Sequence, residues 1–458
     1  DRGIVGQKRA CELPTRFTVD TTVQNLPGVA YQISGPVNVG TDCGGSGTAV
    51  GCQAVTLTIQ PGTLLFGSAG LDYLAVNRGS RLNAQGTATS PIIFTHRSNI
   101  EGTATDSSQG LWGGVILLGR APISDCNTAV AGGSVDCQNV IEGTTSSLYG
   151  GAAANDNSGT LRFVQIRYSG FEIAPGNELQ GLTMGGVGNA TTIDHVQIHN
   201  SSDDGVEIFG GRVNVKYLAV TGADDDGLDT DLGYRGTVQF YLYVQKPTGD
   251  GDSAFEADSN GNEDALPRQY TRVSNATVVR QRAGSGGNSI LLRGGTDYAL
   301  LNSVITNTAG ACLDIDATGG TTTRAADNAL EDLGPPVFRS VQLACPTAFR
   351  ADGNEATVAT IFGTGTNNNN SAFTPSLSSV FINGANENGV TATDPTPFNA
   401  DAFATVNAGA PNRLEAVTFI GAVQNAAGLA ANWSGWTCNS GYANFGAGSS
   451  LCTAVPTT

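Results

Sequence analysis

Short hydrophobic runs of strand length recur along most of the chain, separated by polar, glycine-rich breaks. The runs are rich in β-branched and aromatic residues, and no helix-period pattern lies between them, so they predict β-strands without intervening helices. This excludes an alternating α/β architecture, in which helices connect successive parallel strands. The expected strands include residues 55–59, 92–95, 115–118, 161–167, 193–198, 213–220, 238–244, 276–280 and 299–305.

One segment, residues 324–332, has a composition that permits a short helix. It stops before Gly334-Pro335-Pro336, and proline does not continue a helix. We therefore expect a short helical insertion at the surface, placed between two strands.

An internal repeat is the strongest signal in the sequence. Residues 203–208 (DDGVEI) align without gaps on residues 225–230 (DDGLDT), a spacing of 22, and residues 252–256 fit the same frame 27 residues further on. Strands that repeat at this spacing without helices predict the turns of a parallel β-helix. A leucine-rich repeat has a similar period, but its Leu-x-x-Leu-x-Leu frame is absent. The predicted fold class is an all-β, right-handed parallel β-helix.

Three segments near the start resemble the opening coils of a known group of proteins: residues 55–63 (VTLTIQPGT), 82–95 and 111–119 (LWGGVILLG). Residues 417–423, followed by WSGWT at 433–437, resemble the closing segment of the same group. These are secreted bacterial surface proteins with a pectin-lyase-like right-handed parallel β-helix. The resemblance spans most of the chain and implies this fold and export, but it implies little about activity.

The predicted layout is one continuous domain. Residues 1–54 form an N-terminal arm or cap, residues 55–345 the coils, and residues 346–458 the C-terminal coils and cap. A solenoid needs capped ends, because open strand edges pair with other chains. We expect Trp433 and Trp436 to cover the last coil.

Nine cysteines are present, and none has the Cys-x-x-Cys spacing of a metal site. Local pairs in polar loops predict disulfides and therefore an oxidising compartment. The expected pairs are Cys43–Cys52, Cys126–Cys137, Cys438–Cys452 and, across a longer insertion, Cys312–Cys345. Cys11 is then unpaired, unless it displaces one partner in the first pair. The chain starts at Asp1 without Met or an apolar leader, so we expect an extracellular or cell-surface protein whose signal peptide has been removed.

The net charge limits the classes of molecule that the protein can bind. Forty acidic residues against 23 basic ones give a net charge of −17. Nucleic acids attract clustered Lys and Arg, so they are excluded as partners, whereas divalent cations suit such a surface. No stretch approaches the roughly 20 apolar residues of a membrane span.

The repeat also predicts a column of acidic side chains. Strand alternation should turn Val206 and Ile208 inward and Glu207 outward, and the aligned Asp229, Glu256 and Asp314 should share that outer face. Glu207 and Asp229 would then lie about 5 Å apart and repel each other. A bound cation, a nearby Arg212 or Arg235, or a raised pKa would offset the repulsion.

Three interpretations of this column are open. The aspartates could serve as corner residues that accept hydrogen bonds from neighbouring backbone N–H groups. They could bind Ca²⁺, which takes several oxygen ligands, although no EF-hand or nonapeptide calcium repeat is present. The predicted ligands are Asp203, Asp204, Asp225, Asp226 and Asp229.

The third interpretation is catalysis. The paired aspartates superficially resemble those of polygalacturonase-type hydrolases, which place an acid and a base on neighbouring coils. The family's Gly-His-Gly and Arg-Ile-Lys segments have no counterpart here, and only three lysines could serve a lyase. If the protein is an enzyme, the expected residues are Asp203, Asp204, Asp225, Asp226, Asp229 and Arg293.

The favoured hypothesis is a non-enzymatic extracellular structural or surface protein. It would be a rigid rod that self-assembles into homo-oligomers or filaments, or contacts surface polysaccharide. The alternatives are a carbohydrate-active hydrolase or lyase, and a glycan-binding module with exposed Tyr234, Tyr241 and Tyr243 stacking on sugars. His195 and His199 are expected on the coil surface, facing the same side.

Overall fold

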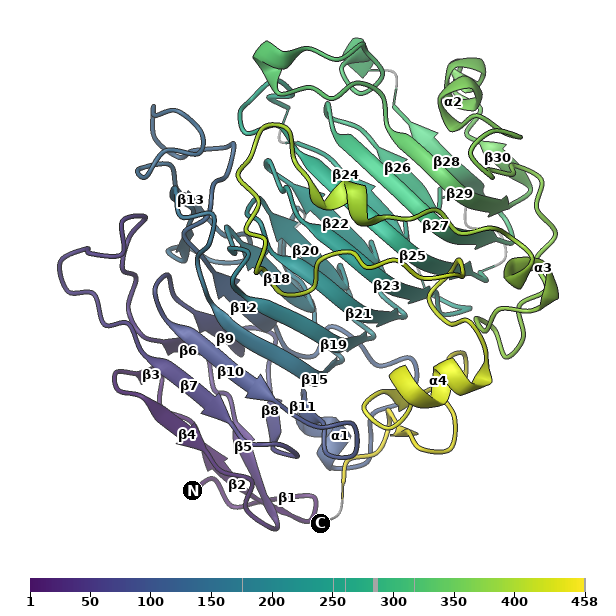
Figure 1. Cartoon of the computed structure of the whole chain (residues 1–458). Helices are drawn as coiled ribbons and strands as arrows, with labels where there is room; N and C mark the ends of the chain where they lie inside the picture. The colour runs from purple at the N-terminus through teal and green to yellow at the C-terminus, as the bar shows by residue number, and fades with distance from the viewer. Residues whose placement is uncertain (175, 250, 260, 283–286, 317, 457–458) are drawn as a thin grey trace.

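The computed structural model describes residues 1–174, 176–249, 251–259, 261–282, 287–316 and 318–456. The chain winds into a parallel β-helix: its strands stack in register into a 15-stranded and an 11-stranded sheet (Figure 1). From β12 onward the long strands alternate between the two sheets, and in the earlier coils two short strands, such as β7 and β8, take the place of one long strand of the larger sheet. The predicted fold class is therefore confirmed.

The strands and helices have the following bounds. The 15-stranded sheet contains β1 (Ile4–Val5), β2 (Lys8–Glu12), β4 (Thr21–Val23), β5 (Val29–Gln32), β7 (Thr56–Ile59), β8 (Leu64–Gly67), β10 (Arg81–Gln85), β11 (Ile92–His96), β15 (Gly159–Arg167), β19 (Thr192–His199), β21 (Asn214–Thr221), β23 (Thr237–Val244), β25 (Tyr270–Arg280), β27 (Asp297–Asn307) and β29 (Val337–Ala344). The 11-stranded sheet contains β3 (Arg16–Phe17), β6 (Pro36–Val39), β9 (Tyr73–Val76), β12 (Gly114–Leu118), β18 (Leu182–Gly185), β20 (Val206–Phe209), β22 (Leu228–Asp231), β24 (Phe255–Ala257), β26 (Ile290–Leu292), β28 (Ala311–Ile315) and β30 (Thr347–Phe349). Three small pairs stand apart: β13 (Asn139–Val140) with β14 (Leu148–Tyr149), β16 (Phe171–Ala174) with β17 (Asn177–Leu179), and β31 (Cys438–Asn439) with β32 (Ser450–Leu451). The helices are α1 (Arg97–Ile100), α2 (Glu355–Phe362), α3 (Ala385–Asn388), α4 (Ala426–Asn432) and the 3₁₀ turns η1 (Thr318–Gly320), η2 (Asn328–Leu330) and η3 (Thr396–Asn399).

The strands begin earlier than residue 55. β2 to β6 pair in parallel with the strands of the following coils, so residues 1–54 contribute to both sheets. Only β1 runs antiparallel, along the outer edge of β2.

Each long strand of the larger sheet bends at one residue in the left-handed region. The ladder skips this residue, which reverses the inward and outward alternation on its far side. In β23, Val238 and Tyr241 therefore both face the interior, whereas Phe240 and Leu242 face outward. The bend residues, with φ between 51° and 59°, are Phe163, His195, Tyr217, Phe240, Asn275, Asn302 and Ser340.

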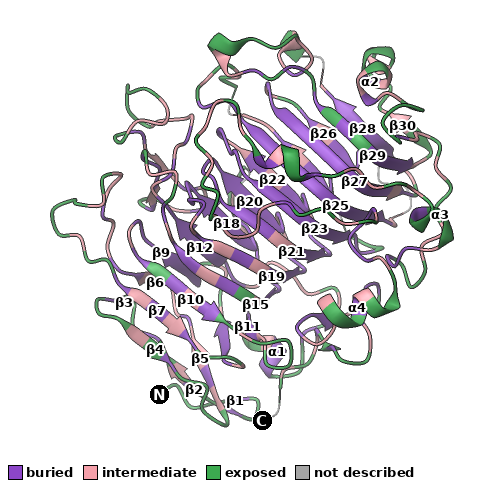
Figure 2. Ribbon diagram, viewed as in Figure 1, coloured by how far each residue is buried: buried purple, intermediate pink, exposed green. Residues whose placement is uncertain are grey.

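Aliphatic side chains from both sheets fill the interior of the coil, and the strands are mostly buried while the turns are exposed (Figure 2). Tyr234, Tyr241 and Tyr243 are fully buried, so the expectation that they are exposed for stacking on sugars is wrong. His195 and His199 are also buried. The three tyrosines are hidden because they face the interior of the coil, whereas the two histidines lie on an outer face that is itself covered.

The cover is the C-terminal strap, residues 377–456, which runs back across the larger sheet (Figure 1). Its apolar side chains, including Trp433 and Trp436, pack on the outward Phe240 and Leu242. The two tryptophans therefore lie on the flank of the coils and not on the last coil. The strap ends beside the N-terminal coils, where Arg167 Nη1 donates to the Cys452 carbonyl oxygen at 2.8 Å.

The last coil is closed by α2 instead. The ring of Phe362 packs 5.4 Å from that of Phe338 and 5.6 Å from that of Phe349. The helix expected at residues 324–332 is only the 3₁₀ turn η2, because the backbones of Asp327 and Asp332 pair and close the segment into a tight turn.

Four disulfides staple the turns: Cys43–Cys52, Cys126–Cys137, Cys312–Cys345 and Cys438–Cys452. These are the pairs expected from the sequence. Cys11, on β2, is a free cysteine and is partly exposed.

A candidate cation site on the acidic column

Carboxylates on neighbouring coils lie side by side on the smaller sheet. The register pairs Glu207 with Asp229 and Asp229 with Glu256, as the repeat predicted. Leu291 takes the next position, so Asp314 is separated from the others by one coil. We call the following residues the acidic column: Asp203, Asp204, Glu207, Asp225, Asp226, Asp229, Asp231, Asp252 and Glu256.

The corner aspartates have a structural role. Asp204 Oδ1 accepts a hydrogen bond from the Asp226 backbone nitrogen at 2.8 Å, and Asp226 Oδ1 accepts one from Ser253 at 2.5 Å. Each carboxylate thus satisfies a backbone N–H of the next coil, as corner residues do. This accounts for one oxygen of each aspartate and leaves the second oxygen for another partner.

The column brings carboxylate oxygens into three overlapping groups, in each of which one oxygen per residue lies within 4.8 Å of the others. The groups are Asp203 with Asp204 and Asp225, Asp204 with Glu207 and Asp229, and Asp225 with Asp226 and Asp252. The spacing follows from parallel coils, which stack equivalent side chains at strand separation.

Burial and mutual repulsion raise the pKa values of these carboxyls. Burial, reinforced by the charge of Asp225, raises the pKa of Asp203 to about 8. Burial and the charge of Asp258 raise the pKa of Asp231 to about 7. Burial and the charges of neighbouring carboxylates raise the pKa values of Glu207 and Asp229 well above their usual range. An uncompensated cluster of this kind binds either protons or a cation at neutral pH.

Two carboxylate oxygens in the middle group are buried without a hydrogen-bond partner among the described residues: Glu207 Oε2 and Asp229 Oδ1. Asp231 Oδ1 is in the same condition. Leaving a buried acceptor unpaired costs on the order of 1–3 kcal/mol. The middle group is therefore where a ligand would relieve the largest cost.

Among the described residues, the ion pairs of the column gather at one end. Arg293 makes an ion pair with Glu256 and a second with Asp258 at 2.8 Å. Arg212 and Arg235, considered above as offsets for Glu207, make other contacts: Arg212 with two backbone carbonyls and Arg235 with Asp401. The sequence repeat could not exclude them, because it does not give the direction of a side chain that follows a strand.

Two further carboxyls reach the column from insertions that the repeat does not contain. The charges of Glu142 and Glu178 both raise the pKa of Asp203, and burial raises the pKa of Glu142 to about 7. The Glu178 backbone nitrogen donates to Glu142 Oε1 at 3.4 Å. No pattern in the sequence connects these segments, because only the packing of the insertions on the sheet brings them together.

Chemically, this arrangement suits a hard divalent cation, for which carboxylate oxygens are the preferred ligands. An inverting hydrolase needs carboxyls roughly 6.5–9.5 Å apart with room for water, a wider spacing than the 4.8 Å within each group. No aromatic platform is formed by the three tyrosines considered above, because all are buried.

No helix in the described part of the chain is long and apolar enough to cross a membrane.

Comparison with known proteins agrees with the fold. No curated protein and no solved structure matches the chain. A family model, the pectate-lyase-like β-helix domain, matches residues 45–382. Since this match covers most of the chain and the coils agree with it, the protein belongs to the family of pectate-lyase-like β-helix domains.

Proposed function

We propose that this protein is a non-enzymatic extracellular surface protein whose acidic column binds a divalent cation, calcium in the first instance. The observation that carries the proposal is the oxygen cluster of Asp204, Glu207 and Asp229, in which two buried oxygens have no partner. The four disulfides support an oxidising location.

A cation here would have both protein ligands and access from outside. Glu207 and Asp204 are buried, whereas Asp225 and Asp252 at the edge of the column are exposed. Calcium takes 6–8 oxygen ligands, more than one group supplies, so the remaining positions fall to water or to oxygens of another molecule. An acidic polysaccharide provides such oxygens, and we propose it as the surface partner.

Calorimetric titration with CaCl₂ tests the cation. We expect saturable binding to the wild-type protein and a melting temperature that falls in excess chelator, because binding to the native state stabilises it. The double variant Glu207→Gln/Asp229→Asn should lose both effects. Asp136→Asn, an exposed acidic residue outside the column, is the matched control and should retain them.

If calcium and chelator leave the wild-type melting temperature unchanged and no heat of binding is measured, the column has only its corner role. The polysaccharide is tested separately by co-sedimentation with polygalacturonate. Co-sedimentation of the protein in calcium but not in chelator supports a bridge through the cation. Co-sedimentation that is the same with and without calcium contradicts it.

The second candidate function is a polysaccharide-degrading enzyme. The exposed position of Arg293 favours it. Its side chain is 44% exposed beside Glu256 and can attract a sugar carboxylate to the column. Incubation with polygalacturonate, followed by assay of new reducing ends and of unsaturated products, distinguishes the two candidates. If the wild-type protein degrades polygalacturonate and Arg293→Gln does not, the protein is an enzyme and the non-enzymatic proposal is wrong.

The two ends of the β-helix differ in how well their strand edges are covered, and this difference affects self-assembly. β3 and β4, in the first coil, have a strand partner on one side only among the described residues. At the other end α2 packs on β29 and β30. Unpaired edges promote pairing with another chain, so an association through the N-terminal ends of two copies is better supported than a head-to-tail filament.

A further inference from the structure

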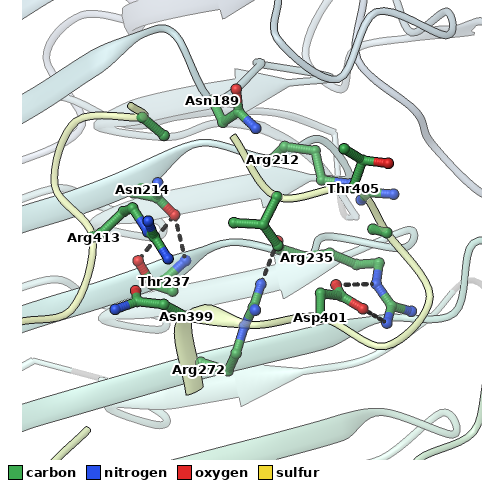
Figure 3. Close-up of a pocket in the computed structure, with 13 residues that line it drawn as sticks. Asn189, Arg212, Asn214, Arg235, Thr237, Arg272, Asn399, Asp401, Thr405 and Arg413 are labelled. Atoms are coloured by element: carbon green, nitrogen blue, oxygen red, sulfur yellow. Dashed lines mark hydrogen bonds and ion pairs between the residues drawn. The ribbon is translucent and has the colours of Figure 1, made fainter. Parts of the chain in front are cut away.

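A second, oppositely charged site lies between the coils and the C-terminal strap. A cavity of about 30 Å³ is surrounded by arginines that come from the coils and from the strap (Figure 3). Arg212, Arg235 and Arg272 belong to the coils, and Arg413 to the strap. The three coil arginines are buried and Arg413 is partly buried, a concentration of positive charge that stands out in a protein whose net charge is −17.

Arg212 is the least compensated of the four. It is 8% exposed, and its Nη1 atom donates to the carbonyl oxygens of Gly211 and Gly233 at 2.9 and 3.2 Å. Its Nε atom is buried and has no hydrogen-bond partner. No carboxylate within the described residues forms an ion pair with it, so a buried guanidinium is left with an unused donor.

The neighbouring arginines do not supply the missing negative charge. Arg235 is neutralised by Asp401, which accepts from both its Nε and Nη2 atoms, as Figure 3 shows. Arg272 donates to backbone carbonyls only, among them that of Arg235. Arg413 donates Nη1 to the Ala408 carbonyl, and its Nε atom is again buried without a partner.

The electrostatic balance of the cavity is therefore positive. Four guanidinium groups line it and Asp401 is its one acidic lining residue, with Glu331 contacting Arg235 at 3.3 Å. Buried charges are ordinarily paired, because an isolated charge in a low-dielectric interior is costly. An anion in the cavity would provide the pairing.

We propose that this pocket is a binding site for a small inorganic anion of about the size of chloride, held by the guanidinium groups of Arg212 and Arg413. The volume favours a small ligand, since about 30 Å³ is only a few times the roughly 10–15 Å³ that a single water molecule needs. Arg212 and Arg413 both line the cavity, so their guanidinium groups supply the donors.

The direction of the Arg212 pKa agrees with this site. Burial, together with the charge of Arg235, lowers the pKa of Arg212 to about 9, so the empty pocket disfavours its charged form. An anion reverses that preference. Because Arg413 and Asp401 belong to the strap, a bound anion also fastens the strap to the coils.

Crystals grown in bromide test the site directly. We expect an anomalous difference peak at the bromine edge in the cavity, within hydrogen-bond distance of the guanidinium groups of Arg212 and Arg413. Bromide peaks at the surface only, with water density in the cavity, would overturn the proposal.

A solution experiment tests the link to stability. The melting temperature of the wild-type protein should rise with chloride relative to gluconate at equal ionic strength, because the anion binds the native state. Arg212→Gln should lose this chloride dependence, yet be at least as stable as the wild type in gluconate, since it removes an uncompensated charge. Arg339→Gln, which changes an exposed arginine away from the pocket, should respond to chloride as the wild type does.

Equal chloride dependence in the wild type and Arg212→Gln would show a general salt effect and contradict the site. Should Arg212→Gln not fold, the bromide map of the wild-type protein decides alone. Neither outcome depends on the acidic column, which lies on another face and binds charge of the opposite sign.

Discussion

At the level of single residues, burial changes His199 from an expected surface side chain into an interior one. Its ring lies 5.5 Å from that of Tyr168 and 6.0 Å from that of Tyr442, and its Nδ1 atom is 2.9 Å from Thr221 Oγ1. Burial, with the nearby charge of Arg167, lowers the pKa of His199 to about 3. The imidazole is therefore neutral in the folded protein throughout the ordinary pH range.

This predicts a pH dependence with a definite sign. The unfolded chain takes up a proton on His199 below about pH 6.5, but the folded protein does so only near pH 3. The stabilisation is present above pH 6.5 and is lost as the pH falls from there. Between pH 7 and pH 5 the loss is about 2 kcal/mol. Denaturant unfolding of the wild type and His199→Gln at both pH values measures it.

The comparison isolates one residue, because the raised carboxyl pKa values of the acidic column act in the opposite direction and equally in both proteins. The wild type should therefore lose more stability than His199→Gln on acidification. The same loss in the two proteins would show that His199 is accessible to protons in the folded state.

At the level of elements, α2 acts as the lid of the last coil. Val358 and Phe362 are each 1% exposed and join the main hydrophobic core. Solenoids depend on such terminal elements because each repeat contacts only its neighbours. The first residues to respond to its loss should therefore be those of β29 and β30.

Phe362→Ala is expected to destabilise the protein by about 3–5 kcal/mol, the usual cost of truncating a buried phenylalanine. Hydrogen exchange should accelerate first in residues 337–349 and leave the central coils protected. Phe373→Ala, at a half-buried phenylalanine beyond the lid, is the control with a smaller effect. Uniform acceleration across all coils would mean that α2 stabilises the whole rod and not its end.

At the level of the whole molecule, the two ends differ, which predicts the mode of association. Cys11 lies on β2, next to the open edges of β3 and β4, and is partly exposed. If two copies meet through this end, sedimentation should show a dimer, and Cys11→Ser should remove any covalent form of it.

A charge on the open edge should prevent the pairing, because natural edge strands use lysine for this purpose. Thr22→Lys, on exposed β4, should give monomers, while Thr360→Lys on α2, at the other end, should leave the dimer intact. Dissociation by either variant would instead indicate head-to-tail assembly, and a wild-type monomer at high concentration would contradict self-assembly altogether.

The sequence by itself determined the features that repeat from coil to coil. The DDGVEI and DDGLDT segments predicted the register of Glu207 on Asp229, because one coil displaced by one strand spacing brings equivalent residues together. Short separations of 9, 11 and 14 residues predicted three of the disulfides, since neighbours in sequence have little freedom to separate. Cys312–Cys345 closes a longer insertion of 33 residues.

Only the tertiary structure decided what covers the coils. The strap packs on Tyr217 and His199, and an insertion brings Glu142 near the acidic column. Arg413 and Arg212, some 200 residues apart in the chain, line the same cavity. None of these contacts repeats from coil to coil, so the sequence repeat does not predict them. Side-chain alternation likewise fails past the bends at His195 and Phe240, where one left-handed residue reverses which side chains face the core. Local patterns define a coil because its contacts are periodic, whereas the sites depend on non-periodic segments whose positions only the packed molecule determines.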